Sequence, residues 1–305
     1  TGVTGQDGCY LAKNLLEKGY KVYGAVKHTT GIQNWRLDEM GITDDIEYVD
    51  VDIVDQANIR RMIDKTKPDE VYNLAAQSFV ALSFEQPEMA ALIDGVGVLR
   101  VLETIYQVNP EIKFYQASTS ELYGKVQEIP QNEKTKFYPR SPYAVAKVYA
   151  HWITVNYREA YNIFACNGIL FNHESPLRGE TFVTSKIIKA LCKLKKTGNV
   201  RLYLGNLYSK RDWGHAKDYV EAAWLMTQKK TADDFVLGSG ELHSVEEFAK
   251  KAFEYVNLNY KDYLKIDKNL IRNRDSVARL ADITKAKKIL NWRPYFSFNK
   301  MVHDM

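Results

Sequence analysis

Thr1-Gly2-Val3-Thr4-Gly5-Gln6-Asp7-Gly8 is a G-x-x-G-x-x-G turn that leads into an amphipathic segment at Tyr10–Lys18. Glycines in such a turn let the backbone approach a pyrophosphate closely. The helix that follows offers free N–H groups and the positive end of its dipole. A tight turn without a ligand is the alternative. The β-α-β order farther along the chain is the context that the motif requires, so the turn predicts a dinucleotide site.

Short apolar runs alternate with longer amphipathic segments through the first half of the chain. The predicted strands are Lys21–Val26, Ile46–Val51, Glu70–Ala75, Lys113–Ser118 and Phe164–Leu170. The predicted helices are Tyr10–Lys18, Gln56–Lys65, Glu88–Gln107 and Pro142–Tyr161. This repeat predicts an α/β protein with a Rossmann-type doubly wound parallel sheet. A β-strand should come directly before the glycine turn, so we expect a short N-terminal piece before Thr1.

The alternation loosens after about residue 170. The predicted elements there are a polar loop at Phe171–Gly179, a helix at Phe182–Lys195, a strand at Val200–Leu204, a helix at Ala216–Gln228 and a strand at Asp234–Leu237. Ser244-Val245-Glu246-Glu247 has the pattern of a capping box that opens a helix to about Val256. We therefore expect two domains: a dinucleotide-binding domain at residues 1–170, completed by later segments, and a smaller mixed α/β substrate domain at residues 171–305.

Composition excludes several classes of protein. Of 305 residues, 45% are hydrophobic and 26% are charged, as in ordinary globular proteins. The 42 basic and 38 acidic residues leave a net charge of +4 that is spread along the chain, so neither a nucleic-acid nor a membrane surface is expected. Cys9, Cys166 and Cys192 are far apart and lack metal-ligand spacing. We expect a cytoplasmic protein without a metal site.

The segments after the second and later strands supply further cofactor candidates. No carboxylate follows the strand at Lys21–Val26 to bind the ribose 2′-hydroxyl of NAD. Lys27, His28 and Arg36 could instead face a 2′-phosphate. The absence of the carboxylate and the presence of these basic residues favour NADP, with NAD still possible. A solvated polar loop is the alternative for each of these three residues. Asp52 and Ile53 could flank the adenine, and small residues could let the cofactor pass at Leu74, Ala75, Ala76 and Ser78. With the turn residues Gly2, Gly5, Gln6, Asp7 and Gly8, they form the predicted cofactor site.

Two motifs carry the candidate chemistry. Tyr143 and Lys147 lie four residues apart and so share one helix face. A nearby ammonium and an oxidised nicotinamide would both lower the pKa of the Tyr143 phenol, which makes it a candidate base for a sugar hydroxyl. Thr119 and Glu121 follow a predicted strand at its carboxyl end, where ligands of open α/β sheets bind. On an extended backbone their side chains would point the same way, Thr119 to bind a substrate oxygen and Glu121 to exchange a proton.

Together these motifs resemble the extended short-chain dehydrogenase/reductase family, and within it the GDP-mannose 4,6-dehydratases. The three-residue step from Gly2 to Gly5 belongs to that branch. The matching segments are residues 1–8, 73–78, 116–121, 137–143, 169–176 and 210–215. The resemblance implies catalytic positions at Thr119, Glu121, Tyr143 and Lys147, and cofactor contacts at Tyr143, Lys147, His173 and Arg178. It places sugar-nucleotide contacts at Ser78, Thr119, Glu121, Asn172, Lys186, Arg211 and Arg272, with the two last arginines near the diphosphate.

The resemblance also implies a reaction, that of an NADP-dependent hydro-lyase. Tyr143 would take the C4 hydroxyl proton of GDP-mannose while hydride passes from C4 to NADP⁺. Glu121 would then remove the C5 proton as water leaves from C6, and hydride would return to C6. The product is GDP-4-keto-6-deoxymannose, and the cofactor stays bound. The family forms tetramers in which the loop after the strand at Lys21–Val26 reaches a neighbour's cofactor, so a homo-oligomer, dimer or tetramer, is expected.

Two departures from the family keep alternatives open. The family's arginine pair is replaced around His28-Thr29, and its Arg-Pro-x-Glu-Val run reads Arg272-Asn273-Arg274-Asp275-Ser276 here. GDP-D-glycero-D-manno-heptose is therefore the rival substrate. Oxidation at C4 alone and 4-epimerisation are further alternatives, although epimerisation needs no base at C5. A scaffold with an inactive Rossmann domain is the alternative outside the enzymes, and the four intact catalytic candidates argue against it.

Overall fold

Parallel strands form the centre of the larger lobe. The computed structural model describes residues 1–27, 34–198, 200–270 and 278–305. Within them a four-stranded parallel sheet has the order β10-β5-β4-β3, and β1 pairs with β2 beside it. The strands are β1 (Tyr23–Val26), β2 (Glu47–Asp50), β3 (Glu70–Asn73), β4 (Lys113–Ala117), β5 (Ala165–Leu170) and β10 (Phe235–Leu237). The predicted parallel α/β fold is confirmed.

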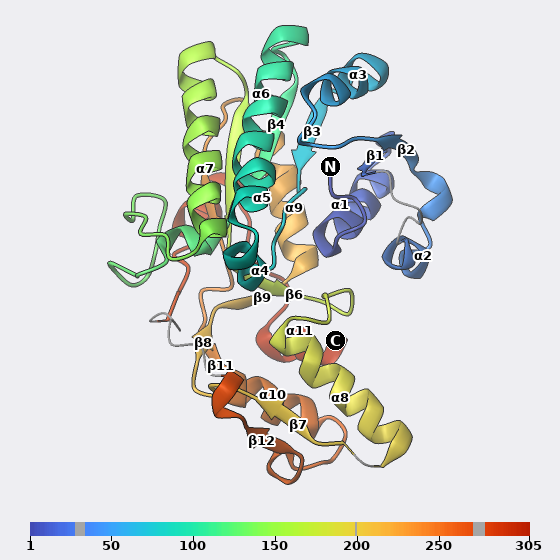
Figure 1. Ribbon diagram of the computed structural model, residues 1–305, viewed down its shortest axis with the longest axis vertical. Coiled ribbons are helices and arrows are strands. Elements are labelled where there is room, and N and C mark those ends of the chain that lie inside the picture. The colour runs from blue at the N-terminus through green and yellow to red at the C-terminus, as the bar shows by residue number, and fades with distance from the viewer. Residues whose placement is uncertain (28–33, 199, 271–277) are drawn as a thin grey trace.

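Helices cover both faces of these strands (Figure 1). They are α1 (Gln6–Glu17), α2 (Trp35–Met40), α3 (Gln56–Thr66), α4 (Val80–Glu85), α5 (Pro87–Ala91), α6 (Gly97–Val108), α7 (Pro142–Tyr161) and α9 (Ala216–Thr227). One cluster of buried apolar side chains includes residues of α1 and α9, and a second includes residues of α3, α6 and α7. Although α9 and β10 come late in the sequence, both belong to the larger lobe.

Most element boundaries lie within a few residues of those predicted, and α7 matches at both ends. Its start is determined locally, because the Ser141 hydroxyl accepts a hydrogen bond from the Ala144 N–H at 3.1 Å and Pro142 occupies the first turn. The helix predicted at Glu88–Gln107 is present as one continuous helical segment, but it is not α-helical throughout. A π-helical turn at Leu92–Val96 separates α5 from α6 and carries the buried Asp94. Helical periodicity cannot reveal a one-residue expansion of this kind.

The smaller lobe is mixed α/β, as predicted. It contains β6 (Asn172–Glu174), α8 (Val183–Thr197), β7 (Leu202–Leu204), β8 (Lys210–Arg211), β9 (Trp213–His215), β11 (His243–Ser244), α10 (Val245–Glu254), β12 (Leu264–Ile266) and α11 (Phe298–Asp304). A third apolar cluster packs α8 and α10 together. The predicted capping box is present, since Ser244 and Glu247 exchange hydrogen bonds of 3.0 and 2.8 Å. The loop predicted at Phe171–Gly179 instead contains β6, which pairs in parallel with β9.

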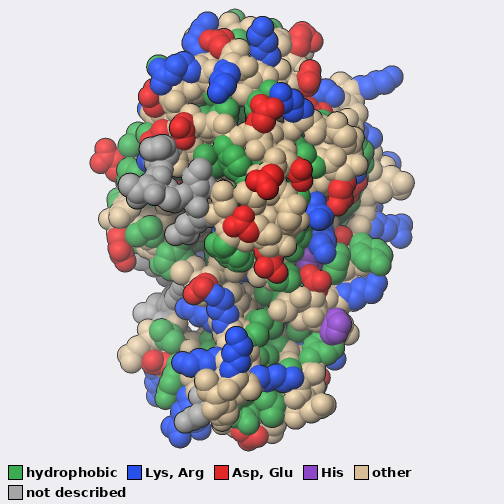
Figure 2. Space-filling model, turned by 90° about the vertical axis from the view of Figure 1, so that its right-hand side faces the viewer, with side chains coloured by type: hydrophobic (Ala, Val, Ile, Leu, Met, Phe, Trp, Pro, Cys, Tyr) green, Lys and Arg blue, Asp and Glu red, His purple; other side chains and the backbone are tan. Residues whose placement is uncertain are grey.

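Two surface features follow from this arrangement. A cavity of about 610 Å³ separates β1 from β3 and is lined by apolar side chains that include Leu11, Val49 and Val71. Lys and Arg side chains gather on one face of the smaller lobe, below the narrowing between the lobes (Figure 2). No helix in the described part of the chain combines the length and apolar character needed to cross a membrane.

Candidate active site

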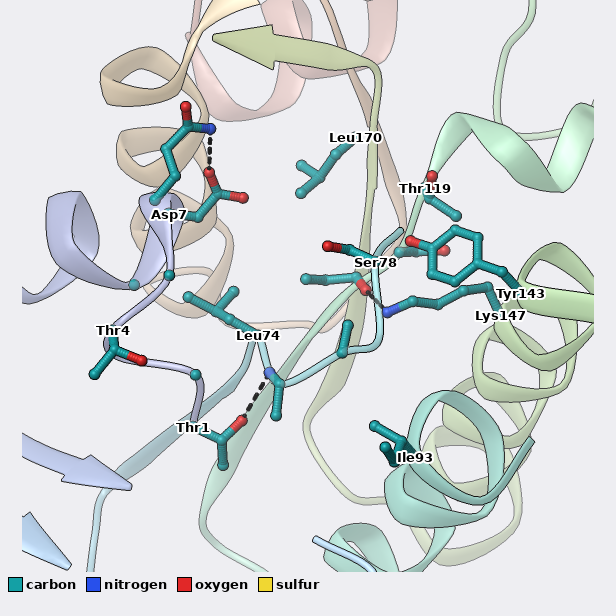
Figure 3. Close-up of a pocket in the computed structure, with 18 of the residues that line it drawn as sticks. Thr1, Thr4, Asp7, Leu74, Ser78, Ile93, Thr119, Tyr143, Lys147 and Leu170 are labelled. Atoms are coloured by element: carbon teal, nitrogen blue, oxygen red, sulfur yellow. Dashed lines mark hydrogen bonds between the residues drawn. The ribbon is translucent and has the colours of Figure 1, made fainter. Parts of the chain in front are cut away.

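A pocket of about 530 Å³ opens where β1, β3, β4 and β5 end. The glycine turn at residues 1–8 forms one wall, on which Thr4 and Asp7 lie, and Thr119, Tyr143 and Lys147 lie on the opposite wall (Figure 3). Ligands of open parallel sheets bind at this edge, because the carboxyl ends of neighbouring strands meet there. The pocket therefore joins the two groups of residues that the sequence indicated separately.

The glycine turn packs too closely for side chains at two positions. Gly2 has a φ of +70°, and a Cβ there would lie 2.8 Å from the Leu74 carbonyl carbon. A Cβ on Gly8 would lie 2.2 Å from the Gly2 carbonyl oxygen, so this glycine allows α1 to begin directly against the turn. The first N–H groups of α1 are thereby held at the pocket wall. Backbone N–H groups at the start of a helix, reached by a close glycine turn, are a geometry suited to a pyrophosphate.

Asp7 and His173 link the turn to β6. The His173 Nε2 lies 2.7 Å from an Asp7 carboxylate oxygen, and its Nδ1 lies 2.7 Å from the Phe171 carbonyl oxygen. Burial opposes the charging of His173, but the Asp7 carboxylate outweighs it and raises the pKa of His173. The Gln6 side chain adds hydrogen bonds to the His173 carbonyl and the Ser175 hydroxyl. His173 thus ties the glycine turn to β6 on the side of the smaller lobe.

Tyr143 and Lys147 project from one face of α7 into the pocket. The Lys147 ammonium donates to the Ala117 carbonyl at 3.0 Å and lies 5.8 Å from the centre of the Tyr143 ring. Both side chains are buried. Burial, with the carboxylates of Asp94 and Glu121, raises the pKa of Tyr143, while a hydrogen bond from Thr119 lowers it. Desolvation of the phenolate is thus the largest influence on the pKa of Tyr143 in this structure, and the lowering expected from Lys147 together with an oxidised nicotinamide stays a prediction.

Thr119 and Glu121 both line the pocket, but not on an extended backbone. Ser120–Tyr123 form a short 3₁₀ turn, and the Thr119 hydroxyl caps it by accepting the Glu121 N–H at 3.2 Å. The predicted two-residue alternation is thus wrong, since the strand ends at Ala117. The Glu121 carboxylate forms an ion pair with the buried Arg279, whose Nη2 lies 2.7 Å from Oε1.

Asp94 is a buried carboxyl group near the reactive side chains. One of its oxygens accepts the Gln77 N–H at 2.9 Å, and the other has no hydrogen-bond partner among the described residues. Burial raises the pKa of Asp94 to about 6, although the charge of Lys147 opposes this rise. Burial likewise lowers the pKa of Lys147, against the influence of Asp94. Asp94 is thus an electrostatic partner of Lys147 that no motif predicted.

The end of the pocket predicted to hold the adenosine ribose contains Lys27 and Asp52, which form an ion pair of 2.9 Å. His28 lies outside the described residues. Arg36 is not among the described residues that line the pocket. Its guanidinium donates to the carbonyls of Leu177 and Thr4, at 2.8 and 3.1 Å, and so ties the glycine turn to the loop after β6.

Most of the predicted site residues meet in this one pocket. Those that line it are Gly2, Gly5, Gln6, Asp7, Gly8, Lys27, Asp52, Ile53, Leu74, Ala75, Ala76, Ser78, Thr119, Glu121, Tyr143, Lys147, Asn172, His173 and Arg178. Lys186, on α8, and Arg211, on β8, lie outside its lining, and Arg272 is outside the described residues. Sequence reasoning missed Ser118, Ile93 and Phe182 in the lining, and the nearby Asp94 and Arg279. The one sequence feature that could have indicated Asp94 is that it is a charged residue within a predicted helix.

Comparison with known proteins adds a family and several relatives. A family profile described as GDP-mannose 4,6 dehydratase matches residues 1–305. GDP-mannose 4,6 dehydratase 1 of Arabidopsis thaliana is 48% identical over all of this chain and 87% of its own. The human GDP-mannose 4,6 dehydratase is 47% identical over 100% of this chain and 89% of its own. The Vibrio cholerae GDP-mannose 4,6-dehydratase is 45% identical, with 91% of its length covered.

Solved structures show the same fold at lower identity. A dTDP-glucose 4,6-dehydratase from Bacillus anthracis, solved in complex with NAD, has a TM-score of 0.85 at 19% identity, over 99% of this chain and 92% of its own. DesIV of Streptomyces venezuelae, a dTDP-glucose 4,6-dehydratase solved with NAD and TYD, has a TM-score of 0.86 at 19% identity, over 99% and 94%. The arrangement of sheet, glycine turn and smaller lobe is thus that of known Rossmann-type enzymes.

Proposed function

Since the chain belongs to the GDP-mannose 4,6-dehydratase family, we propose that it converts GDP-D-mannose to GDP-4-keto-6-deoxy-D-mannose. The observation that carries this proposal is the meeting of Thr119, Glu121, Tyr143 and Lys147 in one pocket with the glycine turn. A dehydratase of this type needs one base at a hydroxyl and a second base at a carbon. Tyr143 and Glu121 supply two such groups from different elements.

We propose NADP as the cofactor, with NAD as the alternative. Two features of the pocket fit a nicotinamide dinucleotide: the glycine cradle in front of α1, and the buried Ser118 hydroxyl on the pocket wall, which has no hydrogen-bond partner among the described residues. Gly2, Gly5, Gln6 and Gly8 would hold the pyrophosphate, and Lys27 would face the adenosine ribose. The bound nicotinamide supplies a hydride acceptor for C4 and a hydride donor for C6, and its positive charge when oxidised favours the Tyr143 phenolate.

The chain's own side chains account for the proton transfers. Tyr143 takes the C4 hydroxyl proton, and Thr119, which is hydrogen-bonded to it, binds the same oxygen. Lys147, anchored on the Ala117 carbonyl, provides positive charge beneath the phenol. Oxidation at C4 acidifies the C5 hydrogen, which Glu121 removes, and Glu121 then returns a proton to the C6 hydroxyl as it leaves. His173 and Arg178 hold the cofactor wall, and Arg178 is itself paired with Glu174 at 3.0 Å.

We further propose that the larger lobe, mainly residues 1–170, binds the dinucleotide and that the smaller lobe, within residues 171–305, binds the sugar nucleotide. Ser78 and Asn172 reach the sugar from the pocket wall. Lys186, Arg211 and Arg272 are assigned to the nucleotide and its diphosphate, because cations and guanidinium groups suit phosphate oxygens. The free thiols of Cys9, Cys166 and Cys192 suit a reducing compartment such as the cytoplasm.

We also propose that the protein forms a homo-oligomer, either a dimer or a tetramer. Val145, Tyr149 and Trp152 follow a spacing of four and three on α7 and so share one helix face. All three are exposed, and 57% of Trp152 is accessible to solvent. A contiguous exposed apolar stripe on a long helix is typical of a protein interface. Figure 1 shows α7 on the outside of the larger lobe.

The decisive experiment is incubation of the purified protein with GDP-mannose and, separately, with GDP-manno-heptose, without added reductant. Products are followed by mass spectrometry. Loss of one water, about 18 mass units, without net NADPH formation establishes the dehydratase, and the relative rates identify the sugar. A loss of about two mass units would instead indicate oxidation at C4 alone. No change with either sugar would overturn the proposal.

A further inference from the structure

Arg279 is a buried cation that belongs to none of the sequence motifs. Only 5% of the residue is exposed, and its Nη2 lies 2.7 Å from Oε1 of Glu121. Glu121 is itself partly exposed and lines the pocket. The ion pair therefore connects the interior of the protein with the carboxylate that faces the substrate space.

The backbone around Arg279 is anchored from two directions. Arg279 forms a parallel bridge with Arg211 of β8, and Ala281 forms another with Gln131. Gln131 is buried, donates its N–H to the Leu280 carbonyl at 2.8 Å and accepts the Leu280 N–H on its side chain at 2.9 Å. The buried Asp212 accepts the Ala281 N–H at 3.1 Å. These contacts hold the segment that carries Arg279 and so fix the position of its guanidinium beside Glu121.

Moving a guanidinium out of water costs free energy. The ion pair with Glu121 compensates only part of the Arg279 side chain. Its Nε is buried and has no hydrogen-bond partner among the described residues. Buried ion pairs of this kind contribute little to stability compared with apolar replacements, yet removing one partner leaves an uncompensated charge. Placement of such a pair at the pocket wall therefore points to a role in positioning.

We infer that Arg279 is a positioning residue for Glu121 in the dehydration step. The inference rests on the proposed function. The guanidinium orients the Glu121 carboxylate and stabilises its negative charge before it meets the C5 hydrogen.

The elimination balances around this pair. The C5 proton passes to the Glu121 carboxylate, the C5–H electron pair forms the C5–C6 double bond, and the C6–O bond breaks. Neutralised Glu121 beside a buried guanidinium is unfavourable, so the proton moves on to the departing C6 oxygen and water leaves. The carboxylate and its ion pair are restored. Arg279 thus favours both the orientation of Glu121 for proton removal and the rapid delivery of that proton to the leaving group.

The test separates the two half-reactions in single turnovers of the NADP-loaded protein with GDP-mannose. Absorbance of reduced nicotinamide reports C4 oxidation, and mass spectrometry of quenched samples reports water loss. We expect Arg279→Leu to slow water loss about 10- to 100-fold, because small displacements of a catalytic group have effects of this size. The rate of C4 oxidation should stay within about threefold, as expected for a step that does not use Glu121. Reduced nicotinamide should therefore accumulate transiently.

Three further variants distinguish positioning from a structural role. Arg279→Lys keeps the charge and should restore part of the elimination rate. Arg279→Leu added to Glu121→Asp, which keeps a carboxylate, should slow elimination less than Arg279→Leu does in the wild-type protein, because Arg279 acts through Glu121. Arg293→Leu removes an exposed arginine of the same C-terminal segment and is the matched control.

The outcomes separate this inference from the proposed function. If the wild-type protein dehydrates GDP-mannose and Arg279→Leu eliminates water at the same rate, the inference fails alone. Equal slowing of oxidation and elimination, with a lower urea midpoint, would assign Arg279 a structural role and also overturn it. If the wild-type protein removes water from neither GDP-sugar, the proposed function fails and the inference falls with it.

Discussion

Two acid–base side chains in the same pocket owe their different behaviour to their surroundings. Tyr143 is buried on α7, and its burial, with the nearby carboxylates of Asp94 and Glu121, raises its pKa. Glu121 is partly exposed and paired with Arg279. A buried phenol becomes a base more readily when positive charge is added nearby, whereas Glu121 already has a cation beside it. The order of the proposed reaction, hydroxyl first and carbon second, follows from the substrate, because oxidation at C4 is what acidifies the C5 hydrogen.

At Tyr143, removal of one oxygen should abolish the first step. Tyr143→Phe retains the ring but has no proton acceptor for the C4 hydroxyl, so oxidation should slow about 10²- to 10⁴-fold. The measurement is the absorbance of reduced nicotinamide in a single turnover with excess enzyme. Oxidation at the wild-type rate would refute the assignment of Tyr143 as the base.

At Glu121, the expected defect lies one step later. Glu121→Gln preserves size and polarity but cannot take the C5 proton, so the variant should oxidise C4 and then stop. Quenched samples should contain the 4-keto sugar nucleotide, two mass units below the substrate, and no dehydrated product. Dehydration by this variant at the wild-type rate would show that another group removes the C5 proton.

At the level of secondary structure, a histidine caps the N-terminus of α9. The Nδ1 of His215 accepts the Lys217 N–H at 3.1 Å, and its Nε2 lies 2.9 Å from an Asp304 oxygen of α11. The ring is fully buried and stacks on Phe296 at 4.0 Å. This bonding suits a neutral imidazole, and burial lowers the pKa of His215 to about 4 despite Asp304.

The lowered pKa predicts a dependence of stability on pH. Between about pH 4 and pH 6.5 the unfolded chain binds a proton at His215 that the native protein does not, so the free energy of unfolding rises with pH across this interval. The contribution, about 3 kcal/mol, is present above pH 6.5 and is lost as the pH falls to 4. His215→Asn keeps a capping acceptor but does not titrate. Urea unfolding at pH 4.5 and 7 should show a smaller loss on acidification in the variant; equal losses would contradict the assignment.

The exposed stripe on α7 makes a second prediction at this scale. Trp152→Glu places a charge in the middle of the proposed interface and should convert the oligomer to smaller species, because desolvating an unpaired carboxylate is costly. Sedimentation velocity measures the change. Tyr208→Glu, at a 72% exposed residue of the smaller lobe, is the control and should leave the assembly unchanged. An unaltered mass for Trp152→Glu would place the interface elsewhere.

For the whole molecule, function depends on contacts between distant parts of the chain. His173 joins β6 to the glycine turn, Arg36 joins that turn to the loop after β6, and Arg279 reaches Glu121 from the C-terminal region. The lobes are also interleaved in sequence, because α9 and β10 return to the larger lobe after the chain has entered the smaller one. The pocket between the glycine turn and the catalytic residues is therefore defined by all of these segments at once.

Features that depend on near neighbours along the chain could be predicted from the amino-acid sequence. The glycine turn, the alternation of strands and helices, the cap at Ser141 and the four-residue step from Tyr143 to Lys147 are local patterns, and local geometry allows few alternatives for them. The catalytic candidates could be listed from such patterns and from family resemblance.

Features that depend on burial and on distant partners could be established only from the folded chain. The pairing of Glu121 with Arg279, the 3₁₀ turn that carries Glu121, the π-helical turn with Asp94 and the raised pKa of Tyr143 all belong to this group. No spacing rule relates residues at opposite ends of a chain, and desolvation is a property of the packed environment. For that reason the sequence indicated the candidate catalytic side chains, while the fold determined their burial, their partners and their orientation.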